Sequence, residues 1–384
     1  MGLERAINIA DLRRLALRRL PWLLGDWLDG GSEDEFAIRR NVSQFRRCRL
    51  VPRYLEDIAG ASTATTLFGR AWSRPFGIAP TGYPGLFWPK GDLALARAAA
   101  AADVPFIMSG AATAAIEDVA RAAPDHAWYQ LYAAKDAGIT RDMVARAAAA
   151  GMGALVVTVD VPAEPKRERN IRNGFDMPFR LTPKIVLDGL AHPAWTARYF
   201  AAGGLPAMDT WARYAPEGAD ATAVALFSDK QFRATLTWRD LERLRAAWPS
   251  KLIVKGILAV DDARRAAAAG ADGIIVSNHG GRQGDRLPAP LEVLRPILDA
   301  VPDVAVMVDG GIRRGADIVT LLALGARFAF VGRAPLFGLT VAGEAGVARA
   351  MDILRDEMLI TLRQIGRPTI DRLGPDAILD VDQD

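Results

Sequence analysis

The chain lacks most of the features that mark secreted, disulfide-bonded or membrane-spanning proteins. Its single cysteine, Cys48, rules out an internal disulfide and favours a reducing compartment. No apolar run approaches the roughly 20 residues that span a bilayer. The segment from Met1 to Arg19 is charged throughout, unlike the apolar stretch of a signal peptide. No basic run is interleaved with aromatic residues, so we expect no nucleic-acid partner. The single cysteine leads us to expect a cytoplasmic location.

The composition is that of an ordinary globular protein. Of the 384 residues, 51% are hydrophobic and 24% are charged, which is enough for one large α/β domain or two smaller ones. The net charge of +3 suits an anionic substrate, a phosphate-bearing cofactor or an anionic lipid surface about equally well.

A repeated order of alanine-rich helix, glycine and β-branched strand organises most of the chain. Gly151, Gly270 and Gly325 each follow an amphipathic run, as expected of a helix stop. The runs that follow are apolar at nearly every position, which is typical of parallel strands buried on both faces. Eight such strands favour a (β/α)₈ barrel, although periodicity alone leaves an open, doubly wound sheet as the alternative. The expected strands are 76–80, 104–108, 128–132, 155–160, 252–255, 273–277, 304–308 and 328–331.

The remaining segments fit around such a barrel as parts of one domain, residues 1–384. Residues 1–60 contain helices between Ile9 and Asn41, with Pro21 opening the second, and are expected to cap the barrel. The barrel itself spans 61–345, and residues 346–384 form C-terminal helices and a tail. Residues 163–236, after the fourth strand, form a long excursion without a strong period, and loops of such length are usually functional or mobile.

Polar or glycine residues follow nearly every expected strand. In a barrel of this kind the carboxyl ends of the strands form the active site, and a purely structural barrel does not need such groups at all eight positions. The residues are Pro80, Thr81, Gly82, Ser109, Gln130, Tyr132, Thr158, Asp160, Lys255, Ser277, His279, Arg282, Asp309, Gly310, Gly311, Arg313, Gly332 and Arg333.

The loops after the last two strands have the composition of a phosphate site. Gly310, Gly311 and Gly332 leave backbone N–H groups open to close approach, and Arg313 and Arg333 add forked donors. For either loop alone, a tight turn with a surface arginine is an equally good interpretation. The two loops together favour phosphate.

The segment 277–283 places a histidine and an arginine three residues apart among glycines. His279 can take a proton, and Arg282 can grip a carboxylate with two hydrogen bonds. The other histidines, His126 and His192, have no such setting and are interpreted as structural. Asp160 can orient the imidazole, or it can simply cap a loop or helix.

Lys255 ends an otherwise apolar strand, so its buried ammonium needs an anionic partner. A neighbouring carboxylate and an anionic reduced flavin both satisfy that requirement.

Together these residues resemble the family of FMN-dependent 2-hydroxy acid oxidases and dehydrogenases, over about Leu20 to Leu373. The sequence Ser-Asn-His-Gly-Gly-Arg-Gln at 277–283 is similar to the signature of that family, and 88–97 is similar to its mandelate-oxidising members. The resemblance implies a (β/α)₈ barrel that holds FMN and no metal. It implies oxidation of an (S)-2-hydroxy acid to the 2-oxo acid, and a homotetramer, since relatives often are tetramers.

The resemblance also implies roles for individual residues. His279 would be the base that removes a proton from the substrate, with Asp160 as its partner. Arg282 and Arg167 would bind the carboxylate, and Tyr132 would hydrogen-bond the substrate and stabilise the transition state. Pro80, Thr81, Gly82, Ser109, Gln130, Thr158, Lys255 and Ser277 would contact the flavin ring or ribityl chain, and Asp309, Gly310, Gly311, Arg313, Gly332 and Arg333 the ribityl and phosphate groups.

Three departures from the family pattern affect the substrate. Trp27 stands where members usually have a tyrosine whose hydroxyl helps bind the carboxylate. Either the arginines hold the carboxylate with different help, or the substrate is an ester or lactone such as pantoyl lactone. Ala111 stands where members with smaller substrates often have tryptophan, which favours a bulky or aromatic, mandelate-like substrate, with a lactate-like one as the alternative. Gly284 replaces a leucine, with no predicted effect.

Two other functional classes share part of this pattern. FMN-dependent barrel isomerases have the glycine–arginine phosphate site but lack the paired His279 and Arg282 with Arg167. A catalytically silent barrel has no physical reason to keep all of these groups together with Asp160 and Lys255.

The part of the excursion from 178 to 236 combines aromatic and basic residues, among them Trp195, Tyr199, Phe200 and Trp211. Such a composition suits docking at a membrane surface, at the inner face of the cytoplasmic membrane. A mobile active-site lid and an oligomer contact are equally good interpretations. A quinone as electron acceptor would follow from docking, and O₂ from its absence.

Overall fold

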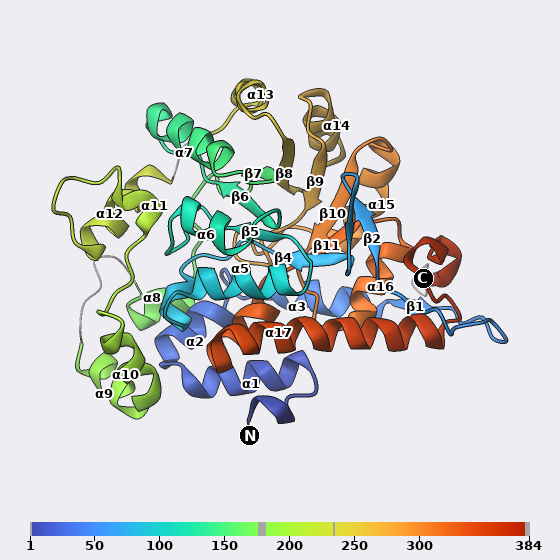
Figure 1. Ribbon diagram of the computed structural model, residues 1–384, viewed down its shortest axis with the longest axis horizontal. Helices are drawn as coiled ribbons and strands as arrows, with labels where there is room; N and C mark the ends of the chain where they lie inside the picture. The colour runs from blue at the N-terminus through green and yellow to red at the C-terminus, as the bar shows by residue number, and fades with distance from the viewer. Residues whose placement is uncertain (1, 176–181, 233–234, 381–384) are drawn as a thin grey trace.

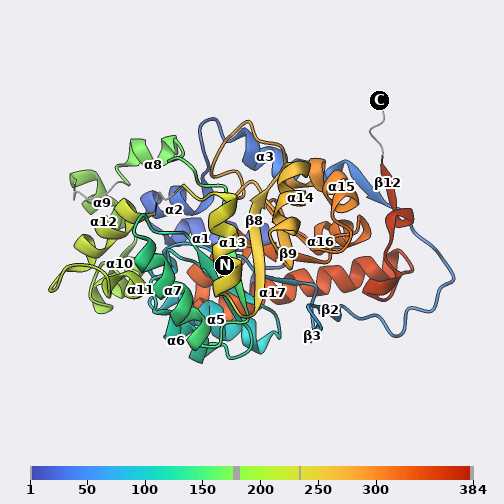
Figure 2. The ribbon, with the colours of Figure 1, turned by 90° about the horizontal axis from the view of Figure 1, so that it is seen from above.

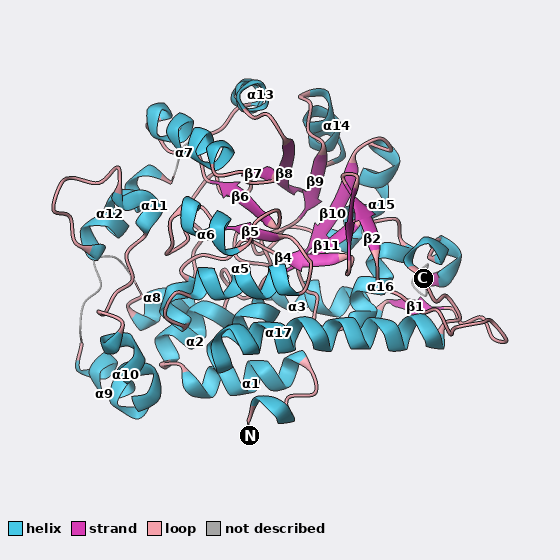
Figure 3. Ribbon diagram, in the orientation of Figure 1, coloured by secondary structure: helices cyan, strands magenta, loops and turns pink. Residues whose placement is uncertain are grey.

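The computed structural model describes residues 2–175, 182–232 and 235–380. Parts of the excursion discussed above, residues 176–181 and 233–234, therefore lie outside the described residues. Eight parallel strands form a closed barrel at the centre, and helices surround it (Figures 1 and 3). The expected (β/α)₈ barrel is confirmed, and the open sheet is excluded.

The barrel strands follow the chain order around the ring. Each lies within or beside an expected range, because each is a short run that is buried on both faces. They are β4 (Phe76–Ile78), β5 (Phe106–Met108), β6 (Ala127–Leu131), β7 (Ala154–Thr158), β8 (Lys251–Ile257), β9 (Gly273–Val276), β10 (Ala305–Asp309) and β11 (Phe328–Val331), and β11 pairs with β4 to close the ring.

An outer ring of helices covers the barrel and buries one continuous apolar core against it. These helices are α5 (Gly91–Ala101), α6 (Ile116–Ala122), α7 (Ala137–Ala149), α13 (Trp238–Ala247), α14 (Val260–Ala268), α15 (Pro290–Ala300), α16 (Gly315–Ala323) and α17 (Arg333–Gln364). Helix α17 is kinked at Ala342 and Gly343, where Gly343 has φ +59° and the Trp88 ring lies where a Cβ would be. Only glycine fits this close approach.

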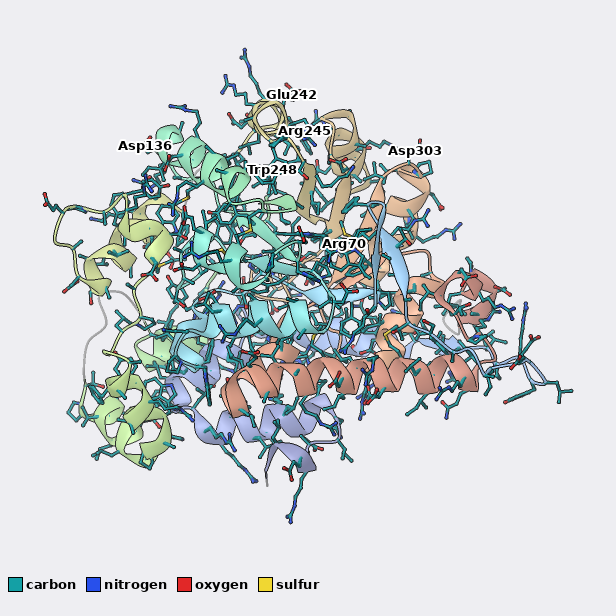
Figure 4. The ribbon with its side chains drawn as sticks, viewed as in Figure 1. Arg70, Asp136, Glu242, Arg245, Trp248 and Asp303 are labelled. Atoms are coloured by element: carbon teal, nitrogen blue, oxygen red, sulfur yellow. The ribbon has the colours of Figure 1, made fainter. Side chains whose placement is uncertain are left out.

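The amino-terminal end of the barrel is closed by structural contacts. The hairpin of β2 (Thr65–Leu67) and β3 (Arg70–Trp72) inserts Trp72 into the interior cluster, and the Arg70 guanidinium lies 3.9 Å from the centre of its ring. Asp272 accepts from Arg245 of α13 and from Lys251, both at 2.9 Å. Figure 4 labels Arg245 beside α13. This end is therefore paired and packed.

The N-terminal segment forms α1 (Ile9–Arg19), α2 (Trp22–Asp29) and α3 (Phe36–Ser43), with Pro21 as the N-cap of α2. Helix α1 packs along α17, and α2 borders the carboxyl end of the barrel. Strand β1 (Cys48–Leu50) pairs with β12 (Ile378–Asp380) far from the excursion (Figure 2). The assignment of residues 1–384 to one domain stays a prediction.

The excursion is helical in its described parts. It contains α8 (Glu168–Asn173), α9 (Pro183–Ala191), α10 (Pro193–Ala201), α11 (Asp209–Ala212) and α12 (Ala221–Gln231), all on one side of the molecule (Figures 1 and 2). No helix among the described residues is long and apolar enough to cross a membrane.

Candidate active site

A cavity of about 310 Å³ opens at the carboxyl ends of the barrel strands, within the usual size range of a ligand site. Most of the residues expected at the site line it, and the others lie just beneath. The lining includes Trp27, Pro80, Thr81, Gly82, Ser109, Ala111, Tyr132, Arg167, Lys255, His279, Arg282, Asp309, Gly310, Gly311, Arg313, Gly332 and Arg333. Gln130, Thr158 and Ser277 are buried at the ends of their strands.

His279 is held between a carboxylate and a phenol. Its Nδ1 lies 3.0 Å from Asp160 Oδ1, and its Nε2 lies 3.4 Å from Tyr132 Oη. Because Nδ1–H donates a hydrogen bond to Asp160, Nε2 carries the lone pair, and it lies next to Tyr132, which lines the cavity. The backbone of His279 is left-handed, with φ +58°, a strained conformation for a non-glycine residue that is common at functional sites.

Burial favours a neutral imidazole at His279, and the neighbouring groups favour an ionised carboxylate at Asp160. Burial lowers the pKa of His279, and the Asp160 carboxylate offsets only part of that shift. Burial would raise the pKa of Asp160, but His279 and Lys255 outweigh it, so this pKa lies below its usual range. A neutral imidazole beside an ionised carboxylate is the state that a general base requires.

Arg282 presents a donor that no described residue uses. Its Nη1 donates to the carbonyls of Trp27 (2.7 Å) and Gly30 (2.9 Å), while its Nη2 is buried without a hydrogen-bond partner among the described residues. Burial lowers the pKa of Arg282 well below its usual value, and Arg167 adds repulsion. Arg167 in turn donates from Nε to the Arg282 carbonyl at 3.3 Å. Two buried guanidinium groups side by side favour an anionic ligand.

Trp27 supports this arginine through its ring. The Arg282 guanidinium lies 4.6 Å from the centre of the Trp27 ring, a cation–π contact. The same ring contacts Tyr83 edge-on at 6.0 Å and Phe87 at 5.6 Å. The residue that replaces the expected tyrosine thus contributes a platform for the arginine and joins an aromatic wall of the cavity.

Lys255 has the carboxylate partner that the sequence left open. Its Nζ lies 3.2 Å from Asp309 Oδ2 and 3.0 Å from Ser277 Oγ, in a position that is 3% exposed. Burial would lower the pKa of Lys255, but Asp309 and Asp160 outweigh it and raise the pKa. The lysine is therefore a fixed cation in the lining of the cavity, where it suits an anionic group of a bound ligand.

Several buried polar atoms fit a flavin ring edge. Gln130 Oε1 accepts from Gly110 N at 3.0 Å, which leaves its Nε2 free to donate. Buried polar atoms are almost always paired, so those without partners indicate a ligand. Among the described residues the unpaired atoms include Gln130 Nε2, Thr81 Oγ1, Thr158 Oγ1 and Asp309 Oδ1, all on residues expected to contact FMN. The donor set present at the site therefore fits this cofactor.

The expected phosphate site is strongly positive. Burial lowers the pKa of Arg333 to about 9, and it also lowers the pKa of Arg313. Arg333 already donates to the carbonyls of Gly280 and Gly30, both at 2.9 Å, so it also fixes these loops. Gly311, with φ +83°, is required by packing, since a Cβ there would lie 1.9 Å from the Asn41 carbonyl oxygen. An anion would relieve the burial of both guanidinium groups.

The sequence interpretation missed several residues that line the cavity, among them Tyr83 and Phe232. Tyr83 directly follows the expected cofactor residues 80–82, which was an available signal. Phe232, after α12 in the excursion, packs edge-on against Tyr132 at 5.5 Å. Nothing in the excursion's irregular pattern could have placed it there. His126 and His192 pair with Asp103 and Asp188, outside the cavity.

Comparisons with known proteins agree with this geometry. The sequence profile of the FMN-dependent dehydrogenase family matches residues 16–380. (S)-mandelate dehydrogenase of Pseudomonas putida is 42% identical over 97% of this chain and 94% of that protein. L-lactate dehydrogenase of Caulobacter is 37% identical over 98% of this chain and 99% of that protein. A crystal structure described as monotopic membrane protein (S)-mandelate dehydrogenase superposes with a TM-score of 0.94 at 41% identity, covering 98% of this chain and 100% of that one.

Proposed function

The chain belongs to the FMN-dependent dehydrogenase family, and we propose that its preferred substrate is a bulky, aromatic (S)-2-hydroxy acid. As a member of this family it is an FMN-dependent oxidoreductase that oxidises 2-hydroxy acids to 2-oxo acids. The observation that carries the 2-hydroxy acid part of this proposal is that a base and a carboxylate-binding arginine line the same cavity. His279 Nε2 and the unpaired Nη2 of Arg282 both belong to its lining.

The residues divide the work of oxidation between them. Arg282 and Arg167 hold the substrate carboxylate, which places the reacting carbon beside His279. His279 Nε2 takes the proton that leaves the substrate, and Asp160 stabilises the imidazolium that results. Tyr132 Oη, 3.4 Å from Nε2, donates to the substrate oxygen. When bound, FMN accepts the two electrons that the substrate loses.

The preference for an aromatic substrate is supported by the cavity wall. Ala111 is small and lines the cavity together with the rings of Trp27, Tyr83 and Phe232, and its carbonyl accepts from Tyr83 N at 2.9 Å. Such a wall can bury a phenyl ring. Full burial of a phenyl side chain contributes about 1.5–3 kcal/mol. A methyl group, as in lactate, would leave that surface in contact with water.

An anaerobic flavin-bleaching assay tests the proposal. The purified yellow protein is mixed with (S)-mandelate, lactate, glycolate or pantoyl lactone, and the loss of flavin absorbance is followed. We expect mandelate to bleach the flavin fastest and His279→Asn to stay yellow without bleaching. His192→Asn, the matched control outside the cavity, should bleach normally. Faster bleaching by glycolate would contradict the aromatic preference, and faster bleaching by pantoyl lactone would favour the lactone alternative.

The excursion supports a second proposal, that the protein docks on a membrane through α9 and α10. Leu187, Leu190 and Phe200 are 66%, 69% and 70% exposed on these helices, while Lys184 lies over the Trp22 ring at 4.2 Å. Exposed apolar side chains beside basic ones are typical of interfacial helices. Near the other end of the excursion, Phe232 packs against Tyr132 and lines the active-site cavity. One segment thereby combines the docking and lid interpretations.

Vesicle binding tests the docking. Replacing Leu187, Leu190 and Phe200 together by serine should abolish co-sedimentation with anionic phospholipid vesicles and leave flavin bleaching intact. Unchanged co-sedimentation would contradict docking by this face. Docking would bring the enzyme to a lipid-soluble quinone, and its failure would favour O₂ as the acceptor. The expected homotetramer stays a proposal, which light scattering on the purified protein tests.

A further inference from the structure

One ring of the aromatic wall carries a hydroxyl group that the residue roles described above leave unused. Tyr83 lines the active-site cavity, and its hydroxyl has no hydrogen-bond partner among the described residues. Its ring meets the Trp27 ring edge-on, with the planes at 84° and the centres 6.0 Å apart. Trp27 is the residue that stands where a tyrosine was expected. The cavity therefore has a phenol beside the position at which one is missing.

The backbone at Tyr83 is unusual for a residue with a side chain. Its φ is +54°, in the left-handed region, at the N-cap of α4 (Pro84–Phe87). Glycine adopts this region readily, whereas other residues are strained there. Two hydrogen bonds hold the conformation: Tyr83 N donates to the Ala111 carbonyl at 2.9 Å, and the Tyr83 carbonyl accepts from Leu86 N at 3.0 Å. A tyrosine kept at such a position indicates a function for its side chain.

The Tyr83 hydroxyl is a neutral donor near a cation. Burial and the Asp229 carboxylate raise the pKa of Tyr83 to about 12, although the Arg167 guanidinium lowers it. The phenol therefore keeps its proton at neutral pH. Asp229 and Arg167 also line the cavity, so all three groups face the same space. A protonated hydroxyl close to a guanidinium can donate to the same carboxylate that the guanidinium binds.

The arginines of the cavity leave an acceptor for this hydroxyl. The Trp27 ring contacts both the Tyr83 ring and the Arg282 guanidinium, the latter at 4.6 Å, and Arg167 Nε donates to the Arg282 carbonyl at 3.3 Å. The two arginines and the phenol are thus linked through neighbouring contacts. An ionised carboxylate has two oxygens with about four lone-pair sites. The unpaired Nη2 of Arg282 fills only part of them, so a further donor fits the same ligand.

We propose that the Tyr83 hydroxyl donates a hydrogen bond to the substrate carboxylate, and so makes the contact that a tyrosine at position 27 would make. This inference rests on the proposed function, because it requires a substrate with an ionised carboxylate. The work of one tyrosine is then divided between two residues. The Trp27 ring supports Arg282, and the Tyr83 hydroxyl completes the anion site. The arrangement favours the acid over an ester or lactone, since a neutral carbonyl oxygen gains less from these donors.

Binding of a 2-oxo acid tests this contact without turnover. The flavin-loaded protein is titrated with phenylglyoxylate, the 2-oxo product of mandelate, or with its methyl ester, and calorimetry gives Kd. Tyr83→Phe keeps the ring beside Trp27 and removes only the hydroxyl. We expect it to raise Kd for phenylglyoxylate about tenfold, the effect of one hydrogen bond to a charged group, and Kd for the ester less than threefold. KM for (S)-mandelate should rise by a similar factor, with a smaller fall in kcat.

Further variants separate the hydroxyl from the shape of the wall. Trp27→Tyr in the Tyr83→Phe background returns a hydroxyl to the same site and should bring Kd for phenylglyoxylate back to within threefold of the wild type. Tyr54→Phe, at a tyrosine that is 78% exposed outside the cavity, is the matched control and should bind like the wild type. If Tyr83→Phe does not fold, Tyr83→Asn replaces it, because asparagine tolerates the left-handed backbone and its amide is shorter than a phenol. It should also weaken binding of the acid more than binding of the ester.

Three results would overturn the proposal. The first is an unchanged Kd for phenylglyoxylate in Tyr83→Phe. The second is an equal loss for acid and ester, which would make Tyr83 a part of the wall alone. The third is a folded, flavin-loaded double variant that shows no rescue. Failure of the proposed function gives a different result, because wild-type protein would then bind phenylglyoxylate although no 2-hydroxy acid bleaches its flavin.

Discussion

Replacing Asp160 by asparagine isolates the electrostatic part of the proposed base. The carboxylate lies 3.0 Å from His279 Nδ1, so the charge centres of an imidazolium and a carboxylate are about 4 Å apart. At an effective dielectric constant of about 20, such a pair is stabilised by about 4 kcal/mol. Each 1.36 kcal/mol corresponds to tenfold in rate. An amide keeps the shape and can still accept from Nδ1, so the rate should fall by up to about a thousandfold.

The assay is the rate of flavin reduction in single turnover, measured against pH. The Asp160 carboxylate raises the pKa of His279 against the effect of burial, so its removal should lower this pKa further. A base is active above its pKa, and the acid limb of kcat/KM should therefore move to lower pH while the plateau falls. Simple misfolding would reduce the amount of bleachable flavin without moving the limb.

Asp188→Asn is the matched control, because Asp188 pairs with His192 at 3.1 Å outside the cavity. It should leave both rate and pH profile unchanged. A plateau in Asp160→Asn within threefold of the wild type, or an acid limb that moves to higher pH, would refute the assignment of His279 and Asp160 as base and partner.

Three further predictions follow from buried groups. Burial raises the pKa of Asp92 to about 6, well above the usual value of a carboxyl group, so the native state loses stability as the pH rises through this range. Asp92→Asn should raise the free energy of unfolding by up to about 3 kcal/mol at pH 8 and by little at pH 4, measured by urea denaturation. Arg282→Met should raise Kd for (S)-mandelate about tenfold to a hundredfold, from the roughly 1.5–3 kcal/mol of a charged hydrogen bond, with a much smaller effect on methyl mandelate; equal losses would contradict the carboxylate role. Gly311→Ala should weaken FMN retention and lower Tm, because φ is +83° and the added Cβ meets the Asn41 carbonyl; an unchanged Tm would contradict this packing argument.

The barrel could be predicted from the sequence because its strands carry an unmistakable burial pattern. Runs such as Ala154–Thr158 are apolar at every position but the last, and that last residue is the polar one that reaches the mouth. The site followed for the same reason, since the carboxyl end of each strand is fixed once the strand is known. Local pattern and global fold agree over these segments.

What the sequence could not predict depends on contacts between distant segments. Lys255 needed an anion, but the sequence did not show that Asp309 lies 3.2 Å away, because β8 and β10 are separated by β9 and their side chains come together only in the closed ring. Phe232 reaches Tyr132 across a hundred residues, from helices that pack by no regular period. Trp27 could be judged only by its ring contact with Arg282, because a pattern reports residue identity and not the direction of an indole.

The contacts of the excursion suggest why it interrupts the barrel after its fourth strand. A segment leaving the carboxyl end of β7 begins at the active-site mouth, and α13 then leads it back to the amino-terminal end of the barrel, where β8 begins. Its last described turn places Phe232 on Tyr132, while its middle places α10 beside α4, next to the Trp27–Phe87 wall. Placed after β7, the excursion borders both the substrate site and a second cavity lined by Phe87 and α10, and the Trp27 and Phe87 rings that lie between them are 5.6 Å apart.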